Sequence, residues 1–480
     1  MYYKRFNNNL LKPDMETIPK LEAIIEKLLI PINKPCSDNK LVDIDTCLVL
    51  FNLASSENWS EKEIKKVNFL SKRFEISKKF FLAYHSSGRK AADQLLSDSI
   101  WLELAVALFL KALLLSLNSS DHALQLKRYN VLFKLLDTIQ PEWLAVNTFF
   151  EKKLLAGWAN LIEILQRNTR VVPTPQYSGS NPDISTPKSN SIPLTVLFYE
   201  GPIARAYLET INSLGLKPQK IIELVAVKDV ATKKPVGRFL PKFMRSDYAS
   251  SIQKTKIHYW PKNLLKTEPE FIDGISTEIQ EKLGFSKQCI DNANALKPLS
   301  EYSDNIESLL VDDLNDKTLF QYLSQQPESA LLFTGGGLVP AELLSMQHLR
   351  FLHIHPGFLP NIRGADCTLW SSLLTGHTSA TCFYMSPGID TGDVIYPCWL
   401  PRLSIINPLD CIERQSIYRA VYGFVDPWVR SFVLRAIVEK SNQFLNLRSD
   451  IQDESEGNTF HFMSHRLQDA AFDSIFKAKD

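Results

Sequence analysis

The sequence lacks the cysteine spacing that would indicate a disulfide framework or a structural zinc site. Its seven cysteines are an odd number, and no two of them stand in a Cys-x-x-Cys arrangement. The N-terminus also lacks the apolar stretch of a secretory signal peptide. Together these absences favour a reducing compartment, and we expect a cytoplasmic protein.

An excess of charge of one sign is also missing, because the formal net charge is +1 over 480 residues. Without a global positive field, capture of a phosphate backbone is not favoured, so we expect no nucleic-acid partner. One apolar run, residues 100–117, is long enough to consider as a membrane span, but it contains Glu103 and Lys111. Charges at a bilayer centre cost about 2.5–3.5 kcal/mol each, so we interpret the run as a buried helix and expect no membrane association.

Residues 1–168 have few glycines and lack the alternating β-branched runs of strands. Apolar residues recur at three- and four-residue steps from Ile18 to Leu29, which indicates a helix with one apolar face. We predict an all-α domain here, a candidate for binding a protein partner or for self-association. Residues 169–193 are rich in Pro, Ser and Asn, and we interpret them as a flexible linker.

Residues 194–400 alternate short apolar runs with helical segments. A strand, a helix and a strand in this order favour parallel pairing through a right-handed crossover. The predicted fold class is therefore α/β, with an open, doubly wound, mostly parallel sheet of the Rossmann-like type. The strands are expected at residues 194–199, 221–227, 308–311, 331–333, 351–354, 380–385 and 394–396.

The usual nucleotide-binding motifs are absent from this α/β region. The first strand-to-helix turn, YEGPIARA, lacks the G-x-G-x-x-G spacing, and no P-loop follows any strand. Residues 401–480 form a C-terminal extension in which helices are expected at 412–422, 428–440 and 465–477.

Two histidines stand two positions apart at the end of a predicted strand. His353 and His355 therefore share one face, and Pro356 and Gly357 end the strand. The carboxyl end of a strand is where open α/β sheets place their ligands. A His-x-His pair can also hold a metal ion, but no further ligands follow at metal-site spacing, so we predict no metal site.

Two glycine-containing loops accompany the histidines. Residues 334–340, TGGGLVP, follow a predicted strand, and their glycines permit either a tight turn or close approach of the backbone to a flat ligand. Residues 385–395, MSPGIDTGDVI, present Asp390 just before the next strand. An aspartate in such a loop is either a functional carboxylate or a turn residue that caps its own backbone.

Taken together, the segments HIHPG, FLPNIRG and DTGDVI resemble the signature of the folate-dependent formyltransferase family. That signature reads Asn-x-His-Pro-Ser, then Leu-Leu-Pro-x-Tyr-x-Gly, and later Asp-x-Gly-x-Ile. Thirty-four residues separate His355 from Asp390, close to the spacing in the family. The resemblance is specific from residue 333 to 395, weaker back to residue 194, and does not reach residues 1–168.

The resemblance implies transfer of a formyl group from N10-formyltetrahydrofolate to the amine of a small molecule, with an amino sugar nucleotide as one candidate. It implies that His355 is the catalytic histidine and that Asp390 orients it and helps to take the proton of the amine. It also implies a set of residues that bracket the pterin of the folate. These are Gly335, Gly336, Gly337, Leu338, Gly388, Ile389, Thr391 and Gly392.

Two positions depart from the family pattern. His353 stands in place of asparagine, and we expect it to replace asparagine as a hydrogen-bond donor; the alternative is a weakened or altered activity. Gly357 stands where the family often has serine. Two other functions stay open from the sequence: hydrolysis of formyltetrahydrofolate, and a folate-sensing scaffold. A methionyl-tRNA formyltransferase would end in a β-barrel, whereas the C-terminal residues here indicate helices.

Overall fold

The computed structural model describes five long stretches of the chain, residues 190–229, 232–403, 409–441, 443–453 and 457–476. It also describes residues 161–166 and a few isolated helical positions between 123 and 159. The chain divides into two units, residues 1–165 and 166–480, and the elements named below lie in the second. The helical domain predicted for residues 1–168, with its apolar run at 100–117, lies almost entirely outside the described residues and stays a prediction.

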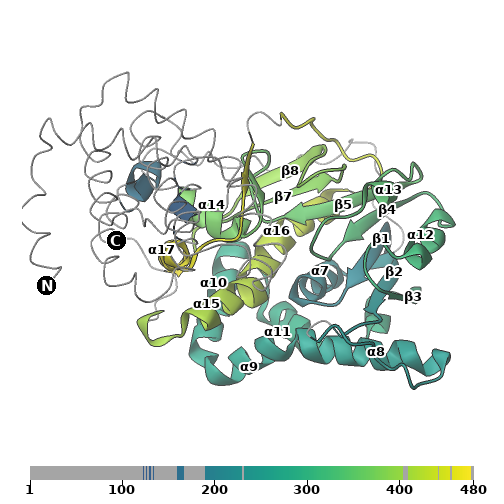
Figure 1. Ribbon diagram of the computed structural model, residues 1–480. Helices are drawn as coiled ribbons and strands as arrows, with labels where there is room; N and C mark the ends of the chain where they lie inside the picture. Colours follow the sequence, from purple (N-terminus) through teal and green to yellow (C-terminus); the bar gives the residue numbers. More distant parts are fainter. Residues whose placement is uncertain are drawn as a thin grey trace, which may run out of the picture. The chain divides into compact units, whose positions relative to one another are not determined.

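A seven-stranded sheet forms the centre of the second unit, in the order β3-β2-β1-β4-β5-β7-β8 (Figure 1). β1 to β5 pair in parallel, while β7 and β8 run antiparallel at one edge. The α/β class and the mostly parallel sheet predicted from the sequence are thus confirmed. The strands are β1 Ser191–Tyr199, β2 Lys217–Ala226, β3 Ile306–Val311, β4 Ser329–Phe333, β5 Leu349–His355, β7 Ser379–Tyr384 and β8 Val394–Trp399.

The first strand begins earlier than the sequence indicates. β1 starts at Ser191, so residues 191–193 belong to this strand rather than to the predicted linker. Ser191 pairs with Lys217 and Ile192 with Pro218, and the Ile192 side chain is buried. The proline and serine content of the segment hid this start, because neither residue type is typical of strands.

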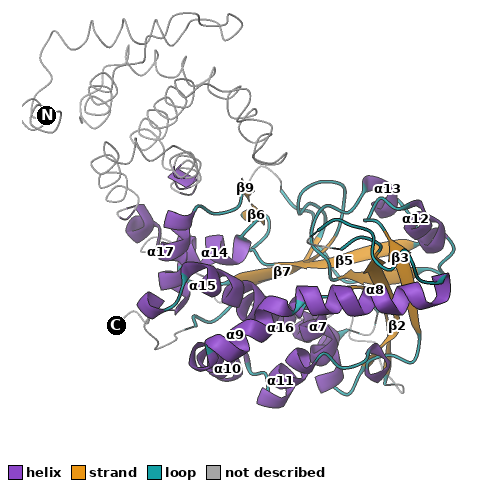
Figure 2. Ribbon diagram, turned by 60° about the horizontal axis from the view of Figure 1, so that its bottom comes forward, coloured by secondary structure: helices purple, strands orange, loops and turns teal. Residues whose placement is uncertain are grey.

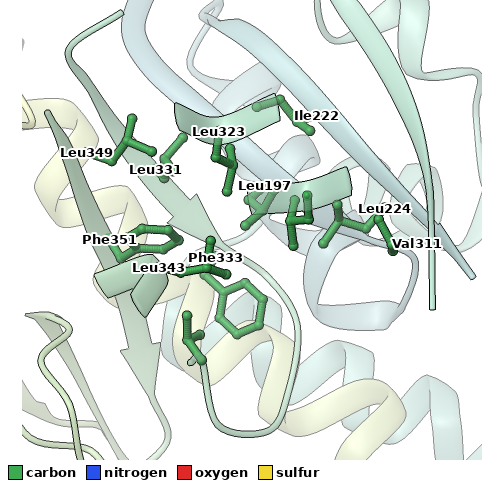
Figure 3. Close-up of a cluster of buried hydrophobic side chains, with 12 residues drawn as sticks. Leu197, Ile222, Leu224, Val311, Leu323, Leu331, Phe333, Leu343, Leu349 and Phe351 are labelled. Atoms are coloured by element: carbon green, nitrogen blue, oxygen red, sulfur yellow. The ribbon is translucent and has the colours of Figure 1, made fainter. Parts of the chain in front are cut away.

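One face of the sheet is covered by α12 (Lys317–Ser324) and α13 (Ala341–Leu344). Asp316 caps α12, because its carboxylate accepts from the backbone N–H of Thr318. Between these helices and the sheet lies one cluster of buried aliphatic and aromatic side chains (Figure 3). It includes Leu197 from β1, Phe333 from β4 and Phe351 from β5. This packed layer fixes the strands whose carboxyl ends carry the two histidines.

The opposite face is covered by longer helices, as Figure 2 shows. α16 (Asp426–Lys440) contacts α7 (Pro202–Ser213) and strands β5 and β7. α8 (Lys242–Ile257) lies against β2, with Ala249 packed on Val225. Because α16 comes from the predicted C-terminal extension, that extension supplies part of the layer that covers β5, the strand of the two histidines.

Three further helices continue the connection from β2 to β3: α9 (Tyr259–Thr267), α10 (Pro269–Leu283) and α11 (Lys287–Ala295). α10 ends at Gly284, whose φ of 69° is the left-handed conformation that glycine adopts without strain. Ser286 then caps α11 by accepting from the backbone N–H of Cys289. No helix in the described part of the chain is long and apolar enough to cross a membrane.

The C-terminal residues form the helices that the sequence predicts, and one strand that it does not. α15 (Arg414–Ala420) leads through a π-helical turn into α16, and α17 (His465–Phe476) packs on α14 (Cys367–Thr375). Between α16 and α17, β9 (Asn458–Phe460) pairs in parallel with β6 (Ile362–Gly364). A three-residue strand with no apolar alternation leaves no sequence signal, so this pairing was missed.

Candidate active site

The carboxyl end of β5 places both histidines on one face, as predicted. β5 lies between β4, its parallel neighbour, and β7, its antiparallel neighbour. His353 is opposite Phe383 of β7, and His355 is opposite Thr381. The glycine turn leaves the end of β4 and the Asp390 loop leaves the end of β7, so the two loops start on either side of β5.

The imidazole of His355 is 2% exposed, and both of its nitrogens face a partner. Nε2 lies 3.0 Å from the carbonyl oxygen of Ile362, and Nδ1 lies 3.3 Å from Oδ1 of Asp390. Gly357 makes the first contact possible. A Cβ at that position would lie 2.4 Å from the Ile362 oxygen and 2.6 Å from Nε2 of His355. The glycine that replaces the serine of the family therefore makes room for the histidine.

Asp390 reaches His355 from a loop with an unusual backbone. Its φ is 52°, in the left-handed region that aspartate and asparagine adopt more readily than other non-glycine residues. Its second carboxylate oxygen, Oδ2, accepts a hydrogen bond of 2.8 Å from the backbone N–H of Gly364. β6 thus holds both members of the pair, His355 through the Ile362 carbonyl and Asp390 through the Gly364 amide.

These contacts limit where protons can lie. A carbonyl oxygen only accepts, so the contact with Ile362 requires a hydrogen on Nε2 of His355. A carboxylate also only accepts, so a hydrogen bond between Nδ1 and Asp390 requires a further proton between them. Burial lowers the pKa of His355, and the negative charge of Asp390 acts in the opposite direction. A neutral His355 can therefore make only one of these two hydrogen bonds at a time, and both together require the imidazolium.

His353 has a different environment. Its Nδ1 lies 3.2 Å from the carbonyl oxygen of Phe333, and its ring lies between the rings of Phe333 and Phe383, at centroid distances of 5.7 and 5.9 Å. Burial of the ring lowers the pKa of His353 to about 4, and the positive charge of Arg430 acts in the same direction. Asp390 opposes both effects. His353 is therefore neutral at physiological pH.

In the glycine turn after β4, Gly335 is tightly packed, whereas the space beside Gly336 is empty. A Cβ at Gly335 would lie 2.7 Å from the ring of Phe333, whereas nothing lies within 4 Å of the corresponding position at Gly336. Gly337 has a φ of 92°, and the Leu338 side chain is 66% exposed. The turn therefore offers bare backbone and one exposed apolar side chain next to the carboxyl end of β5, where the histidines lie.

The loop after β7 is held mainly by its own hydrogen bonds. The hydroxyl of Thr391 donates to the carbonyl oxygens of Ser386 and Pro387. Gly392 has a φ of 119°, and a Cβ there would lie 2.0 Å from the Tyr384 carbonyl oxygen, so only glycine fits. Gly388 has a φ of 140° and lies against the Thr391 side chain, while Ile389 is 45% exposed.

Two functional contributions from distant sequence were not predicted. The side-chain amide of Gln452 donates to the carbonyl oxygens of Asp390, at 3.2 Å, and Gly392, at 2.6 Å. Arg430 of α16 donates to the carbonyl oxygen of Ile354, between the two histidines, and pairs with the buried Asp426 at 2.9 Å. Neither residue lies in a motif, so only the folded chain reveals their positions.

Among the residues that the structure describes, no group of three or more histidine, cysteine, aspartate or glutamate side chains could hold a metal ion. His353 and His355 each direct one nitrogen to a backbone carbonyl oxygen.

Comparison with known proteins identifies the segment around this site. Residues 306–401, from β3 to the end of β8, match the family model described as formyl transferase. Over an aligned stretch of 130 residues, the chain is 31% identical to a methionyl-tRNA formyltransferase of Thermus thermophilus. This stretch makes up 26% of this chain and 41% of that protein. A methionyl-tRNA formyltransferase of Syntrophus aciditrophicus is 31% identical over 85 residues, 17% of this chain and 27% of that protein. The chain thus spans well under half the length of these relatives.

Solved structures similar to this chain have low sequence identity to it and low TM-scores. A sugar N-formyltransferase from Shewanella is 13% identical, with a TM-score of 0.28, and the match covers 56% of this chain and 76% of that chain. A phosphoribosylglycinamide formyltransferase from Bacillus halodurans is 14% identical, with a TM-score of 0.26, over 50% of this chain and 95% of that chain. The family resemblance carried by the motifs is confirmed by the sequence match over residues 306–401, and we draw nothing further from the solved structures.

Proposed function

We propose that the unit containing residues 190–476 transfers a formyl group from N10-formyltetrahydrofolate to the amine of a small molecule. The observation that carries this proposal is the contact between His355 and Asp390, 3.3 Å apart at the carboxyl end of β5. The contact lies inside the segment that matches the formyl transferase family. The two residues are brought together although thirty-four residues lie between them in the sequence, which packing alone does not require.

The pair has the properties that formyl transfer needs. When an amine attacks the formyl carbon, the carbonyl oxygen gains negative charge and the amine nitrogen must lose a proton. An N–H of the His355 imidazole can stabilise that oxygen, and the Asp390 carboxylate beside it can take the proton of the amine. A positioned acid or base contributes about 10²–10⁴ to a rate, and a buried site strengthens the electrostatic part.

The two loops beside β5 suit the pterin of a folate. Leu338 and Ile389 expose apolar surface from opposite loops, and Gly336 and Gly337 leave bare backbone between Phe333 and that surface. A flat ring would cover the apolar side chains, and its amide-like edge would bond to backbone N–H and C=O groups. When bound, the folate supplies the formyl carbon, and Gly335, Gly388, Thr391 and Gly392 keep the loops in shape.

We favour a small amine, such as an amino sugar nucleotide, as the acceptor. The formal net charge of +1 gives no general attraction for a charged polymer. The described residues after 409 form helices and one short strand that pairs with β6. The matched methionyl-tRNA formyltransferases share only part of their length with this chain, so their named substrate is not carried over.

The test is to incubate the full chain with N10-formyltetrahydrofolate and a panel of amines, and to follow formylated products by mass. The panel contains a nucleotide-linked amino sugar, a ribonucleotide amine, methionyl-tRNA and a reaction with no amine. We expect one small amine to be formylated, and Asp390→Asn to lower the rate of that reaction by about 10²–10⁴. Formate without any amine would indicate hydrolysis, folate binding without turnover would indicate a sensor, and absence of folate binding would contradict the proposal.

A further inference from the structure

His353 directs one nitrogen into the protein. Its Nδ1 lies 3.2 Å from the carbonyl oxygen of Phe333, the last residue of β4. A carbonyl oxygen cannot donate, so this contact is a hydrogen bond only if Nδ1 carries the hydrogen. The donor capacity of the neutral ring is then used up inside the sheet, because a neutral imidazole has a single N–H.

The second nitrogen of His353, Nε2, is left with a lone pair. It has no hydrogen-bond partner among the described residues, and the ring is partly exposed, on the same strand face as His355. The groups around the ring do not favour a second proton. Phe333 and Phe383 are apolar neighbours, and Arg430 behind β5 is a cation, while the negative charge of Asp390 acts in the opposite direction. His355 is a second basic group on the same strand.

We infer that His353 presents a hydrogen-bond acceptor to the reacting centre and orients an N–H of the attacking amine. This role differs from the donor expected from the sequence, because the asparagine of the family can always offer an N–H. The inference rests on the proposed function for the identity of the nucleophile. It does not rest on it for the tautomer of His353, which follows from the Phe333 contact alone.

The arrangement divides the tasks of the transfer between the two histidines. The amine nitrogen forms a bond to the formyl carbon, and the bond from that carbon to the donor nitrogen breaks. One proton leaves the amine for the His355–Asp390 pair, and the pair returns a proton to the donor nitrogen. His353 accepts a hydrogen bond from the second N–H of a primary amine and keeps no proton at the end. The site therefore fits acceptors with at least two N–H bonds.

The tautomer can be measured directly in the full chain. Labelling the histidine rings with ¹⁵N gives nine side chains, and each ring nitrogen reports whether it carries a hydrogen. The His353 signals are assigned by their loss in His353→Gln, with His353→Asn as a second variant if the first does not fold. At pH 7 we expect hydrogen on Nδ1 and none on Nε2.

Two other histidines serve as matched controls. Nδ1 of His377 lies 3.1 Å from the carbonyl oxygen of Leu400, so His377 should give the same pattern as His353. Nε2 of His348 lies 3.1 Å from the carbonyl oxygen of Leu323, so His348 should give the opposite pattern. A His353 pattern like that of His348, or one with hydrogen on both nitrogens, would overturn the inference.

A pH titration of the same spectra supplies the second measurement. Because burial lowers the pKa of His353 to about 4, its signals should stay in the neutral pattern from pH 7 to pH 5. Protonation near the ordinary value of about 6.5 would remove the acceptor under physiological conditions and contradict the assignment. These NMR measurements need no turnover. A failed formyl-transfer assay would therefore contradict the proposed function, whereas a different tautomer would contradict the role of His353.

Discussion

Residues 351–395 and residues 443–476 both build the site, but they contribute different things. The first segment supplies the groups to which we assign the chemistry, namely His355 and Asp390, with His353 beside them. The second segment supplies contacts that hold them: Gln452 donates to the Asp390 carbonyl, and β9 pairs with the strand that contacts both members of the pair. Reactive groups are therefore specified by short motifs, whereas their geometry depends on main chain from far along the sequence.

This difference explains how each segment can vary. A reactive side chain must have one chemical identity, so it leaves a recognisable pattern of residue types and spacing. A backbone pairing such as that of β6 with β9 can be made by many sequences, because its hydrogen bonds involve only main-chain groups. Side chains are restricted there only by space, as at Gly364, where a Cβ would lie 2.1 Å from the Phe460 carbonyl oxygen.

The largest expected effect is within the first segment. Asp390→Asn keeps the left-handed backbone, which asparagine tolerates, but removes the negative charge beside His355. We expect turnover to fall by about 10²–10⁴ in a formyl-transfer assay, with little change in melting temperature. Asp393→Asn, three residues on and with no contact to His355 among the described interactions, is the control that should retain activity. Equal losses in the two variants would contradict the assignment of Asp390.

A second substitution, Gly357→Ser, restores the residue that the family often has at this position, and we still expect it to lower turnover. In Gly357→Ser, the new Cβ would lie 2.4 Å from the Ile362 oxygen and 2.6 Å from Nε2 of His355, so the imidazole must move. A displacement of about 1 Å in a reacting group can lower a rate on the order of 10²-fold. Gly423→Ala is the steric control, because its nearest atom is 3.7 Å away. Full turnover in Gly357→Ser would show that the contact with Ile362 is dispensable.

A substitution in the second segment tests whether that segment positions Asp390. Gln452→Leu keeps a similar volume and removes two hydrogen bonds to the loop of Asp390. Each is worth about 1 kcal/mol, so together they limit the expected fall in kcat to about 30-fold, while the KM for folate stays unchanged. Gln468→Leu, which removes a bond to the Met463 carbonyl away from that loop, should lower stability only. A loss of stability in both variants with unchanged kcat would mean that residues 443–476 do not position Asp390.

The smallest expected effect is on the pH dependence of stability. Burial lowers the pKa of His353 to about 4, whereas the unfolded chain has an ordinary value of about 6.5. The unfolded state therefore binds more protons between these values, so the free energy of unfolding is highest above pH 6.5 and falls as the pH decreases toward 4. Because the ring is partly exposed, we expect about 1 kcal/mol. Denaturation at pH 7 and pH 4.5 should show a shallower decrease in His353→Gln; identical curves would contradict the lowered pKa.

Much of the fold was predictable from local sequence. Each of the seven sheet strands was expected within a few residues, because buried strands such as β1 and β2 are continuous apolar runs between turn residues. The parallel order followed from strand–helix–strand spacing. The four helices between β2 and β3 and the pairing of β9 were missed, because amphipathic helices of mixed composition and three-residue strands give weak local signals.

Residue order alone specified which groups this protein can use: two histidines on one strand face, a loop aspartate, and glycines in the two loops beside them. Strand periodicity and turn chemistry are local properties, so residue order was enough for these conclusions. Only the tertiary structure decided the proton arrangement, because the Phe333 and Ile362 carbonyls, Arg430 and Gln452 approach from elements that no motif connects. Hydrogen-bond direction and electrostatic environment depend on distance in space, which residue order alone does not specify.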